Sequence, residues 1–168
     1  PPKNRLPIIT TTSEFNEYML KKAIEFEIQR NGQLFYVFNN ISAIEKKKKN
    51  LQAISSLLNI KIIHGKMKED EIKNVLFEFK KGEFNCLLST TIIENGIDIS
   101  NANTIIVDSI ENFGLAQIHQ IKGRVGRSSV QAYAYLFHKP IKLLNEKSKK
   151  RIQAIKEYIN LVRIFFVR

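Results

Sequence analysis

The sequence predicts an α/β fold: a parallel β-sheet with helices on both faces, followed by a C-terminal helix. Short apolar runs typical of buried strands alternate along the chain with longer segments that have the apolar spacing of amphipathic helices. Short loops join them, and strands that alternate with helices in this way form βαβ units. A last periodic stretch over residues 144–164 predicts the C-terminal helix.

The strands are predicted from apolar runs bounded by turn residues. The clearest is Gln33–Phe38, an almost continuous apolar run that starts after Gly32, as in a strand buried on both faces. The other predicted strands are residues 7–11, 61–64, 84–89, 104–108 and 132–137. The one cysteine, Cys86, lies in the strand at 84–89 and is expected to be a buried core residue. A disulfide within the chain is therefore excluded, which fits a reducing cytoplasm.

The helices are predicted from apolar periodicity and capping residues. The first should begin after a capping box of Thr11 and Glu14 and end at about Arg30. Its expected buried face consists of Phe15, Met19, Ala23, Phe26 and Arg30. Further helices are predicted at residues 41–58, 68–81 and 115–121. The run Lys46–Lys49 interrupts the stripe of the helix at 41–58, and a solvated helix face explains it better than a dedicated nucleic-acid patch.

Positive charge is the main signal in the composition. The chain of 168 residues has 27 Lys and Arg against 16 Asp and Glu, which gives a formal charge of +11 and a pI near 9.8. This excess favours a polyanion partner, because neutralised phosphates release counterions. The alternative is a lysine-rich composition that only solvates the surface. No run approaches the roughly 20 apolar residues of a membrane span, so no membrane partner is expected.

Polar segments follow the predicted strands and indicate one functional edge of the sheet. In parallel sheets, ligands bind beyond the carboxyl ends of the strands. We expect five segments to meet there: Asn39-Asn40, His64-Gly65, Thr90-Thr91, Asp108-Ser109 and the Gly-Arg pair within residues 123–127.

Two segments carry the chemistry of a candidate site. Gly123 to Arg127 presents two guanidinium groups three residues apart, each preceded by a glycine. Glycine lets the backbone approach a ligand closely, and arginine offers a fork of donors that matches phosphate oxygens. Gly96 to Asp98 follows a predicted strand, and its carboxylate could hold a sugar hydroxyl, while hydroxyl residues upstream could hold a phosphate backbone. Together the segments suggest a site that senses nucleotide charge and grips a polynucleotide.

The spacing Gln120-x-x-Gly-Arg-x-Gly-Arg127, about twenty residues after Gly96-Ile97-Asp98, resembles motifs V and VI of the second RecA-like domain of superfamily 2 helicases and translocases. Asn39-Asn40 and His64-Gly65 resemble motif IV and the nucleic-acid-contacting motif that follows it. The narrower resemblance is to the bacterial transcription-repair coupling factors, the Mfd family, over residues 1–161. The segments that carry this narrower resemblance are Thr90–Glu94, Ala102–Ile106, Phe113–Gln117 and Gln131–Tyr135.

The resemblance implies a role for each residue at a matching position. Arg124 and Arg127 would be arginine fingers that reach the γ-phosphate of ATP, and Gln120 would position the phosphate or the attacking water. Three residues would lie against the nucleotide, with the aspartate on the ribose side: Gly96, Asp98 and Gly123. Five residues would face the DNA backbone: Asn39, His64, Gly65, Thr90 and Thr91.

Structural alternatives exist for these residues. They are plain surface charge for the two arginines, a turn or helix cap for Asp98, and local hydrogen bonds for His64 and the threonine pair.

The resemblance also implies which parts of the motor lie on this chain and which lie on another domain. Residues 1–140 would form the helicase C-terminal RecA-like domain, and residues 141–168 would form a helical extension with part of the family's translocation motif. The sequence has no Gly-x-x-x-x-Gly-Lys-Ser/Thr loop and no acidic box, which the family carries on its first RecA-like domain. ATP with Mg²⁺ would therefore be bound mainly by that domain, and no metal ligands are expected here.

The implied function is the second motor domain of an ATP-dependent double-stranded DNA translocase that acts in transcription-coupled DNA repair. Its implied partners are duplex DNA, the first RecA-like domain of the same protein, and RNA polymerase and excision-repair proteins through other domains, all in the cytoplasm. Alone, the chain is expected to be inactive as an ATPase. Two alternatives stay open: a RecG-like domain that remodels replication forks, and a non-catalytic nucleic-acid-binding module.

Overall fold

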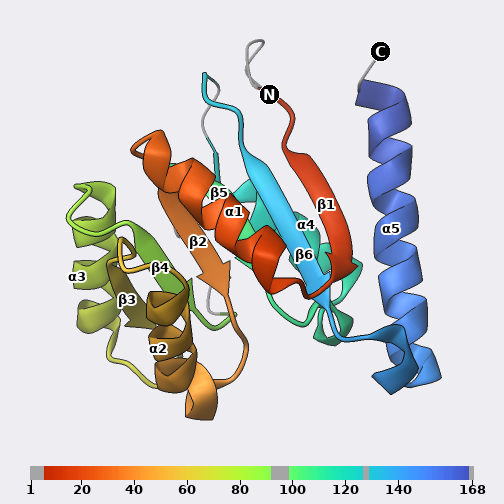
Figure 1. Cartoon of the computed structure of the whole chain (residues 1–168), viewed down its shortest axis with the longest axis horizontal. Coiled ribbons are helices and arrows are strands. Elements are labelled where there is room, and N and C mark those ends of the chain that lie inside the picture. Colours follow the sequence, from red (N-terminus) through yellow and green to blue (C-terminus); the bar gives the residue numbers. More distant parts are fainter. Residues whose placement is uncertain (1–5, 92–98, 127–128, 167–168) are drawn as a thin grey trace.

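Six parallel strands form one sheet in the computed structural model of the chain, which describes residues 6–91, 99–126 and 129–166 (Figure 1). The strands are β1 (Ile9–Glu14), β2 (Gln33–Val37), β3 (Ile60–Ile63), β4 (Cys86–Ser89), β5 (Ala102–Val107) and β6 (Tyr133–His138). Their order across the sheet is β1-β6-β5-β2-β4-β3. The helices are α1 (Glu17–Gln29), α2 (Ile44–Ile54), α3 (Glu69–Lys80), α4 (Leu115–Gly123) and α5 (Glu146–Phe166), with 3₁₀ turns η1 (Ile41–Ala43), η2 (Ile110–Asn112) and η3 (Ile141–Leu143).

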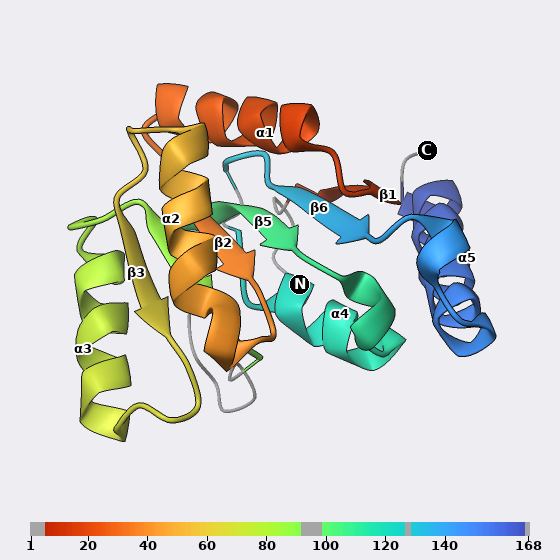
Figure 2. The same ribbon diagram turned by 60° about the horizontal axis from the view of Figure 1, so that its bottom comes forward.

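Helices cover both faces of the sheet because the strands send alternate side chains into two apolar clusters. In β2, Leu34 and Tyr36 join the cluster that contains residues of α1 and α2. Phe35 and Val37 join the cluster that contains residues of α3, α4 and α5. Figure 2 shows α1 and α4 on opposite sides of the sheet. The predicted α/β fold, with a doubly covered parallel sheet and a C-terminal helix, is confirmed.

The start of α1 differs from its prediction. Thr11 and Glu14 belong to β1, where they lie opposite Tyr135 and His138 of β6, so they form no capping box. The helix is capped instead by Asn16, whose side chain accepts a hydrogen bond from the Met19 N–H at 2.9 Å. Pairing with β6 takes precedence over local capping because it secures the backbone groups of the whole segment.

The buried face of α1 is also shifted from the predicted stripe. Its buried residues are Leu20, Ala23, Ile24 and Glu27. Phe15 is 41% exposed and Phe26 is 47% exposed, so the prediction is wrong for both phenylalanines. The face is misassigned because Glu27, which is buried, has the appearance of a surface residue in the sequence.

The remaining elements lie close to their predicted bounds, except that α2 ends at Ile54 rather than near Leu58.

Cys86 is 2% exposed, as expected, and burial raises the pKa of its thiol to about 12. Among the described residues, no helix combines the length and the apolarity that a membrane crossing requires.

A buried carboxylate ties α1 to the centre of the sheet. Glu27 has no exposed surface and accepts hydrogen bonds from Nε of Arg30 at 2.5 Å and from Oγ1 of Thr104 in β5 at 2.5 Å. A Cβ atom at Gly32 would lie 1.9 Å from a carboxylate oxygen of Glu27, so glycine is required at this turn. The arginine completes the cluster by stacking over Phe26 and Tyr133.

We expect Arg30→Ala to destabilise the fold by about 3–5 kcal/mol, because it leaves a fully buried carboxylate without its charged partner. Urea denaturation gives the free energy of unfolding. Lys22→Ala is the control: it removes the exposed Lys22–Glu25 pair, which spans 3.8 Å, and should cost at most about 1 kcal/mol. Equal losses in the two variants would show that the buried pair does not anchor α1.

Candidate functional site

The carboxyl ends of three adjacent strands bring the predicted DNA-facing residues together. β2, β4 and β3 are neighbours, with Val37 opposite Ser89 and Ser89 opposite Ile63. Immediately beyond them, Oγ1 of Thr91 donates a hydrogen bond to Oδ1 of Asn39 at 3.0 Å. The Thr90 N–H donates to the carbonyl of Ile63, the residue before His64, at 3.3 Å. The expected meeting of these segments is confirmed, whereas their contact with DNA stays a prediction.

These residues differ in how far a ligand could reach them. Asn39 and Gly65 are exposed, and His64 and Thr91 are half-buried. Thr90 is only 4% exposed, and its carbonyl accepts a hydrogen bond from Oγ of Ser89 at 2.7 Å. Thr90 is therefore a buried, structural residue of this edge, while the other four residues form the accessible surface of the edge.

The local backbone sets the tautomer of His64. Its Nδ1 accepts a hydrogen bond from the Lys66 N–H at 3.2 Å, so the neutral ring carries its proton on Nε2. An Nε2–H group is a donor, as a phosphate oxygen requires. Lys66 and Lys68 are exposed beside it and add positive charge.

Asp108 also lies at this carboxyl edge, directly after β5, and it organises a cluster with α2. Its carboxylate forms an ion pair with Nζ of Lys47 and accepts a hydrogen bond from the hydroxyl of Tyr36, both at 2.9 Å. The Lys47 ammonium lies 4.9 Å from the ring centroid of Phe38. Burial raises the pKa of Tyr36 well above its usual value, and the charge of Asp108 raises it further, so this hydroxyl stays a donor.

The lysine run of α2 is therefore not uniformly solvated. Lys46 and Lys49 are exposed, as the solvated-face interpretation expects, but Lys47 and Lys48 are half-buried. Lys47 is held between an aspartate and aromatic rings, so it is a structural cation that fixes α2 on the sheet.

The Gly-Arg segment does not lie at the carboxyl edge, so this part of the prediction is wrong. The Gly126 N–H donates to the carbonyl of Ala102, the first residue of β5, at 2.8 Å. The segment follows α4 rather than a strand, and a helix that crosses between parallel strands returns the chain to the opposite end of the sheet. The candidate residues thus divide between the two ends of the sheet.

At the amino end, the residue that follows the Gly-Ile-Asp segment pairs with the Gly-Arg segment. Ile99 pairs with Val125 in a parallel bridge, and the Ile99 N–H donates to the Arg124 carbonyl at 3.3 Å. Ile99 directly follows Asp98 in the sequence. Gly96, Asp98 and Arg127 themselves lie outside the described residues. The association of the two segments therefore stays a prediction, which the pairing of Ile99 with Val125 supports.

Several of the described residues at the amino end are cations. Arg124 is half-buried and, within the described parts of the chain, no carboxylate pairs with it. Burial lowers the pKa of the neighbouring Lys122, and the positive charge of Arg163 lowers it further. Gln120 is exposed one helical turn before Arg124. A surface with uncompensated cations of this kind is suited to bind an anion.

The structure requires glycine at one of the two glycine positions of the Gly-Arg segment but not at the other. Gly126 has a φ of +85°, which favours glycine, and a Cβ atom there would lie 3.3 Å from Cβ of Ala132. A Cβ atom at Gly123 would meet nothing within 4 Å. Packing therefore explains Gly126 but leaves open space beside Gly123, where a ligand could approach the backbone.

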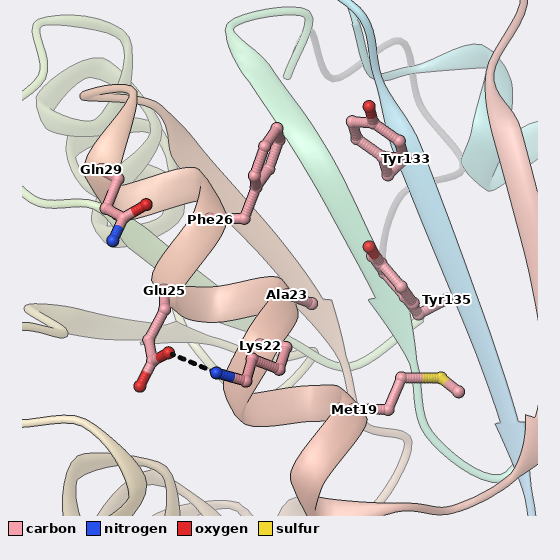
Figure 3. A pocket seen from close by; sticks show the side chains of 8 residues that line it. All are labelled: Met19, Lys22, Ala23, Glu25, Phe26, Gln29, Tyr133 and Tyr135. Atoms are coloured by element: carbon pink, nitrogen blue, oxygen red, sulfur yellow. Dashed lines mark ion pairs between the residues drawn. The ribbon is translucent and has the colours of Figure 1, made fainter.

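A groove of about 460 Å³ lies between α1 and β6 (Figure 3). Its lining includes Phe26, Tyr133 and Tyr135, with the Lys22–Glu25 ion pair on the helix. None of the described residues that we predicted as site residues lines this groove.

Three cations beside the candidate sites were missed by the sequence interpretation. Lys66 and Lys122 are directly next to Gly65 and Gly123, so their positions in the motifs could have indicated them. Arg163 comes from the far end of α5, and no sequence signal brings it next to Lys122.

Comparison with known proteins identifies relatives of the chain. The family described as helicase conserved C-terminal domain matches residues 16–129. A transcription-repair-coupling factor of Staphylococcus haemolyticus is 44% identical over 161 residues, which are 96% of this chain and 14% of that protein. The corresponding protein of Staphylococcus aureus strain USA300 is 43% identical over the same share. The chain therefore spans about one seventh of the length of these relatives.

Solved structures give the same result for the fold. RecG bound to a three-way DNA junction matches with a TM-score of 0.76 and 30% identity, over 95% of this chain and 22% of that one. The C-terminal domain of the DEAD-box protein Dbp5 matches with a TM-score of 0.65 and 18% identity, over 90% of this chain and 84% of that one. The RecA-like helicase fold expected from the sequence is confirmed.

We expect Lys47→Met to destabilise the chain by about 1–3 kcal/mol, because it leaves the largely buried Asp108 without its cation. Lys46→Met, one residue away and exposed, is the matched control and should change stability by no more than about 0.5 kcal/mol. Thermal or urea unfolding of both variants makes the comparison. Equal stabilities of the two variants would support the interpretation that the whole run Lys46–Lys49 is a solvated helix face.

Proposed function

The chain belongs to the helicase conserved C-terminal domain family, and on that basis we propose that it is the second motor domain of an ATP-dependent double-stranded DNA translocase acting in transcription-coupled repair. The observation that carries the proposal is the pairing of Ile99 with Val125. This pairing places the neighbour of Asp98 against the Gly-Arg segment at one end of the sheet. The polar residues suited to a phosphate backbone lie at the other end.

The amino end would complete an ATP site together with the first RecA-like domain. Arg124 and Arg127 would stabilise the charge that spreads over the γ-phosphoryl group, an effect worth roughly 10³–10⁵ in rate. The proximity of Lys122 and Arg163 supports this role, because two neighbouring cations attract a triphosphate. The open space beside Gly123 would let the nucleotide approach the backbone.

In the same site, Gln120 would position the phosphate or the attacking water, and Gly96 and Asp98 would lie on the ribose side. This chain supplies no phosphate-binding loop. ATP and Mg²⁺ would therefore reach it already bound to the first domain.

The carboxyl edge would track the DNA backbone. The donors available there are the hydroxyl of Thr91, the side-chain amide of Asn39 and, with the tautomer set by Lys66, Nε2–H of His64. Gly65 would add close backbone approach, and buried Thr90 would hold the edge in shape. Contacts of this kind fix position without reading base sequence, as translocation along any DNA requires.

The sheet would couple the two ends. β5 has 6 residues, so its ends lie roughly 17 Å apart. Residues 92–98 connect Thr91 at the DNA-facing edge with Ile99 at the nucleotide-facing end. Closure of the two motor domains on ATP would engage the arginines, and hydrolysis would release them and shift the DNA-facing edge.

The remaining assignments follow from the relatives. Residues 1–140 would be the motor domain and residues 141–168 a helical extension. RNA polymerase and excision-repair proteins would bind other parts of a longer cytoplasmic protein, because the chain covers only 14% of its relatives. Remodelling of replication forks is the second candidate, favoured by the similarity to RecG at 30% identity, but the 44% identity to a transcription-repair-coupling factor is higher.

We expect this chain alone to hydrolyse ATP negligibly. In a protein that carries both motor domains, Arg127→Ala and Arg124→Ala should each lower kcat by roughly 10³-fold or more while nucleotide binding persists. Lys80→Ala, which removes an exposed cation from α3, is the control and should leave kcat unchanged. Steady-state ATPase assays and binding of a fluorescent nucleotide measure the two effects. Normal turnover in the arginine variants would remove the finger assignment.

We also expect the chain to bind duplex DNA of any sequence weakly and with strong salt dependence. If four phosphates are neutralised, affinity should fall roughly 10²-fold between about 50 and about 200 mM salt. Fluorescence anisotropy with two unrelated duplexes gives the affinity and its slope. Affinity that does not respond to salt, or that depends on sequence, would contradict a surface that tracks phosphates.

A further inference from the structure

Positive charge is concentrated in one stretch of the chain, at the side of the molecule where α5 lies (Figure 1). Residues 139–163 contain eight of the 27 Lys and Arg but only two of the 16 Asp and Glu. This stretch, the β6–α5 connection and most of α5, therefore carries more than half of the excess charge of +11.

Most of these cations are not neutralised within the structure. Among the described residues, the one ion pair that involves the stretch 139–163 is Lys149 with Glu146, at 3.3 Å. Elsewhere in the described chain, cations that approach the sheet are paired, as Lys47 is with Asp108 and Arg30 with Glu27. A surface that leaves like charges unpaired destabilises the fold by repulsion unless an anion covers it.

Four exposed lysines gather where β6 passes into α5, and we call them the β6–α5 lysine patch: Lys139, Lys142, Lys147 and Lys150. Figure 1 shows this connection at the end of the sheet to which the arrow of β6 points. Lys139 directly follows β6, Lys142 lies within η3, and the other two lysines are one turn apart at the start of α5.

The backbone that carries the patch is held firmly in place. The Lys139 N–H donates to Oε1 of Glu111 at 3.0 Å, and Glu111 is only 3% exposed. Nη1 of Arg151 donates to the carbonyl of the same glutamate at 3.3 Å. Along α5, Ile152 and Ile155 pack into the core below α4. The lysines are therefore presented from a fixed connection and a docked helix rather than from a loose tail.

The patch lies at the same carboxyl edge as the proposed DNA-facing residues but not at the same place along it. β6 is separated from β4 by three inter-strand spacings, so the patch and Thr91 are about 14 Å or more apart. One phosphate cannot contact both places. A polyanion with regularly repeated charges that lies along the edge can contact both.

We propose that the β6–α5 lysine patch is a second phosphate-binding surface, which holds duplex DNA at a separate position from Asn39, His64 and Thr91. The proposal rests on the proposed DNA binding but not on the ATP cycle. Four lysines with long stems would contribute charge and reach, while the polar edge contributes directed hydrogen bonds. With two surfaces, the domain would stay bound to the duplex while the contacts of one surface are released.

The test compares two variants of the whole chain with the same net charge. In the patch variant, Lys139, Lys142, Lys147 and Lys150 are replaced by Gln. In the control variant, four other exposed lysines outside the carboxyl edge are replaced by Gln: Lys22, Lys61, Lys80 and Lys81. The probe is a blunt duplex of arbitrary sequence, and the measurement is log affinity against log salt concentration. Circular dichroism and a urea titration confirm that both variants are folded.

We expect the patch variant to lose affinity and its salt slope to fall by up to about 0.9 for each lysine that contacts a phosphate. The control variant should keep the slope of the unchanged chain. Equal losses in the two variants would mean that only net charge matters and would overturn the proposal, although DNA binding by the polar edge would survive. An unchanged slope in the patch variant would overturn it as well. Failure of the unchanged chain to bind duplex DNA would overturn this proposal together with the DNA binding proposed above.

Discussion

The common direction of the six strands is the constraint on which the rest of the structure depends. Each strand enters the sheet at one end and leaves at the other, so the loops divide into two groups. Polar residues that follow strands gather at the carboxyl edge, where Asn39 and Thr91 are hydrogen-bonded. Residues that follow the crossover helix α4 return to the amino end, where Gly126 is held by Ala102. The fold thereby separates a surface suited to a phosphate backbone from one suited to a triphosphate, and the sheet joins them rigidly.

The cations of the structure fall into two groups, those that form ion pairs and those that do not. Cations inside the layers are paired, and these pairs attach helices to the sheet: Arg30 with Glu27 holds α1, and Lys47 with Asp108 holds α2. Other cations have no carboxylate partner among the described residues, as is the case for Arg124 at the amino end and for the β6–α5 lysine patch. Burying an ion pair stabilises little in itself, but losing one partner is costly, so the paired cations fix geometry. The unpaired ones are available for an anion.

The sequence was sufficient for the architecture and for the grouping of Asn39, His64 and Thr91, because apolar periodicity and parallel topology determine both. It was misleading where tertiary pairing prevails over a local signal. Thr11 and Glu14 have the pattern of a helix start, but β6 draws them into a strand. The face of α1 was misassigned because a buried glutamate cannot be recognised until Arg30 and Thr104 are known to surround it. The Gly-Arg segment was assigned to the wrong end because its motif specifies chemistry but not which side of a crossover it occupies.

We propose that this chain offers two separate anion-binding ends, of which the amino end acts on ATP only together with another domain. The most direct measurement is a structure of a protein with both motor domains, bound to duplex DNA and to ADP with a γ-phosphate mimic. We predict that the Arg124 guanidinium lies about 3 Å from the mimic while Asn39 and Thr91 face the DNA backbone. A nucleotide bound at the carboxyl edge, with Arg124 turned to solvent, would contradict the account.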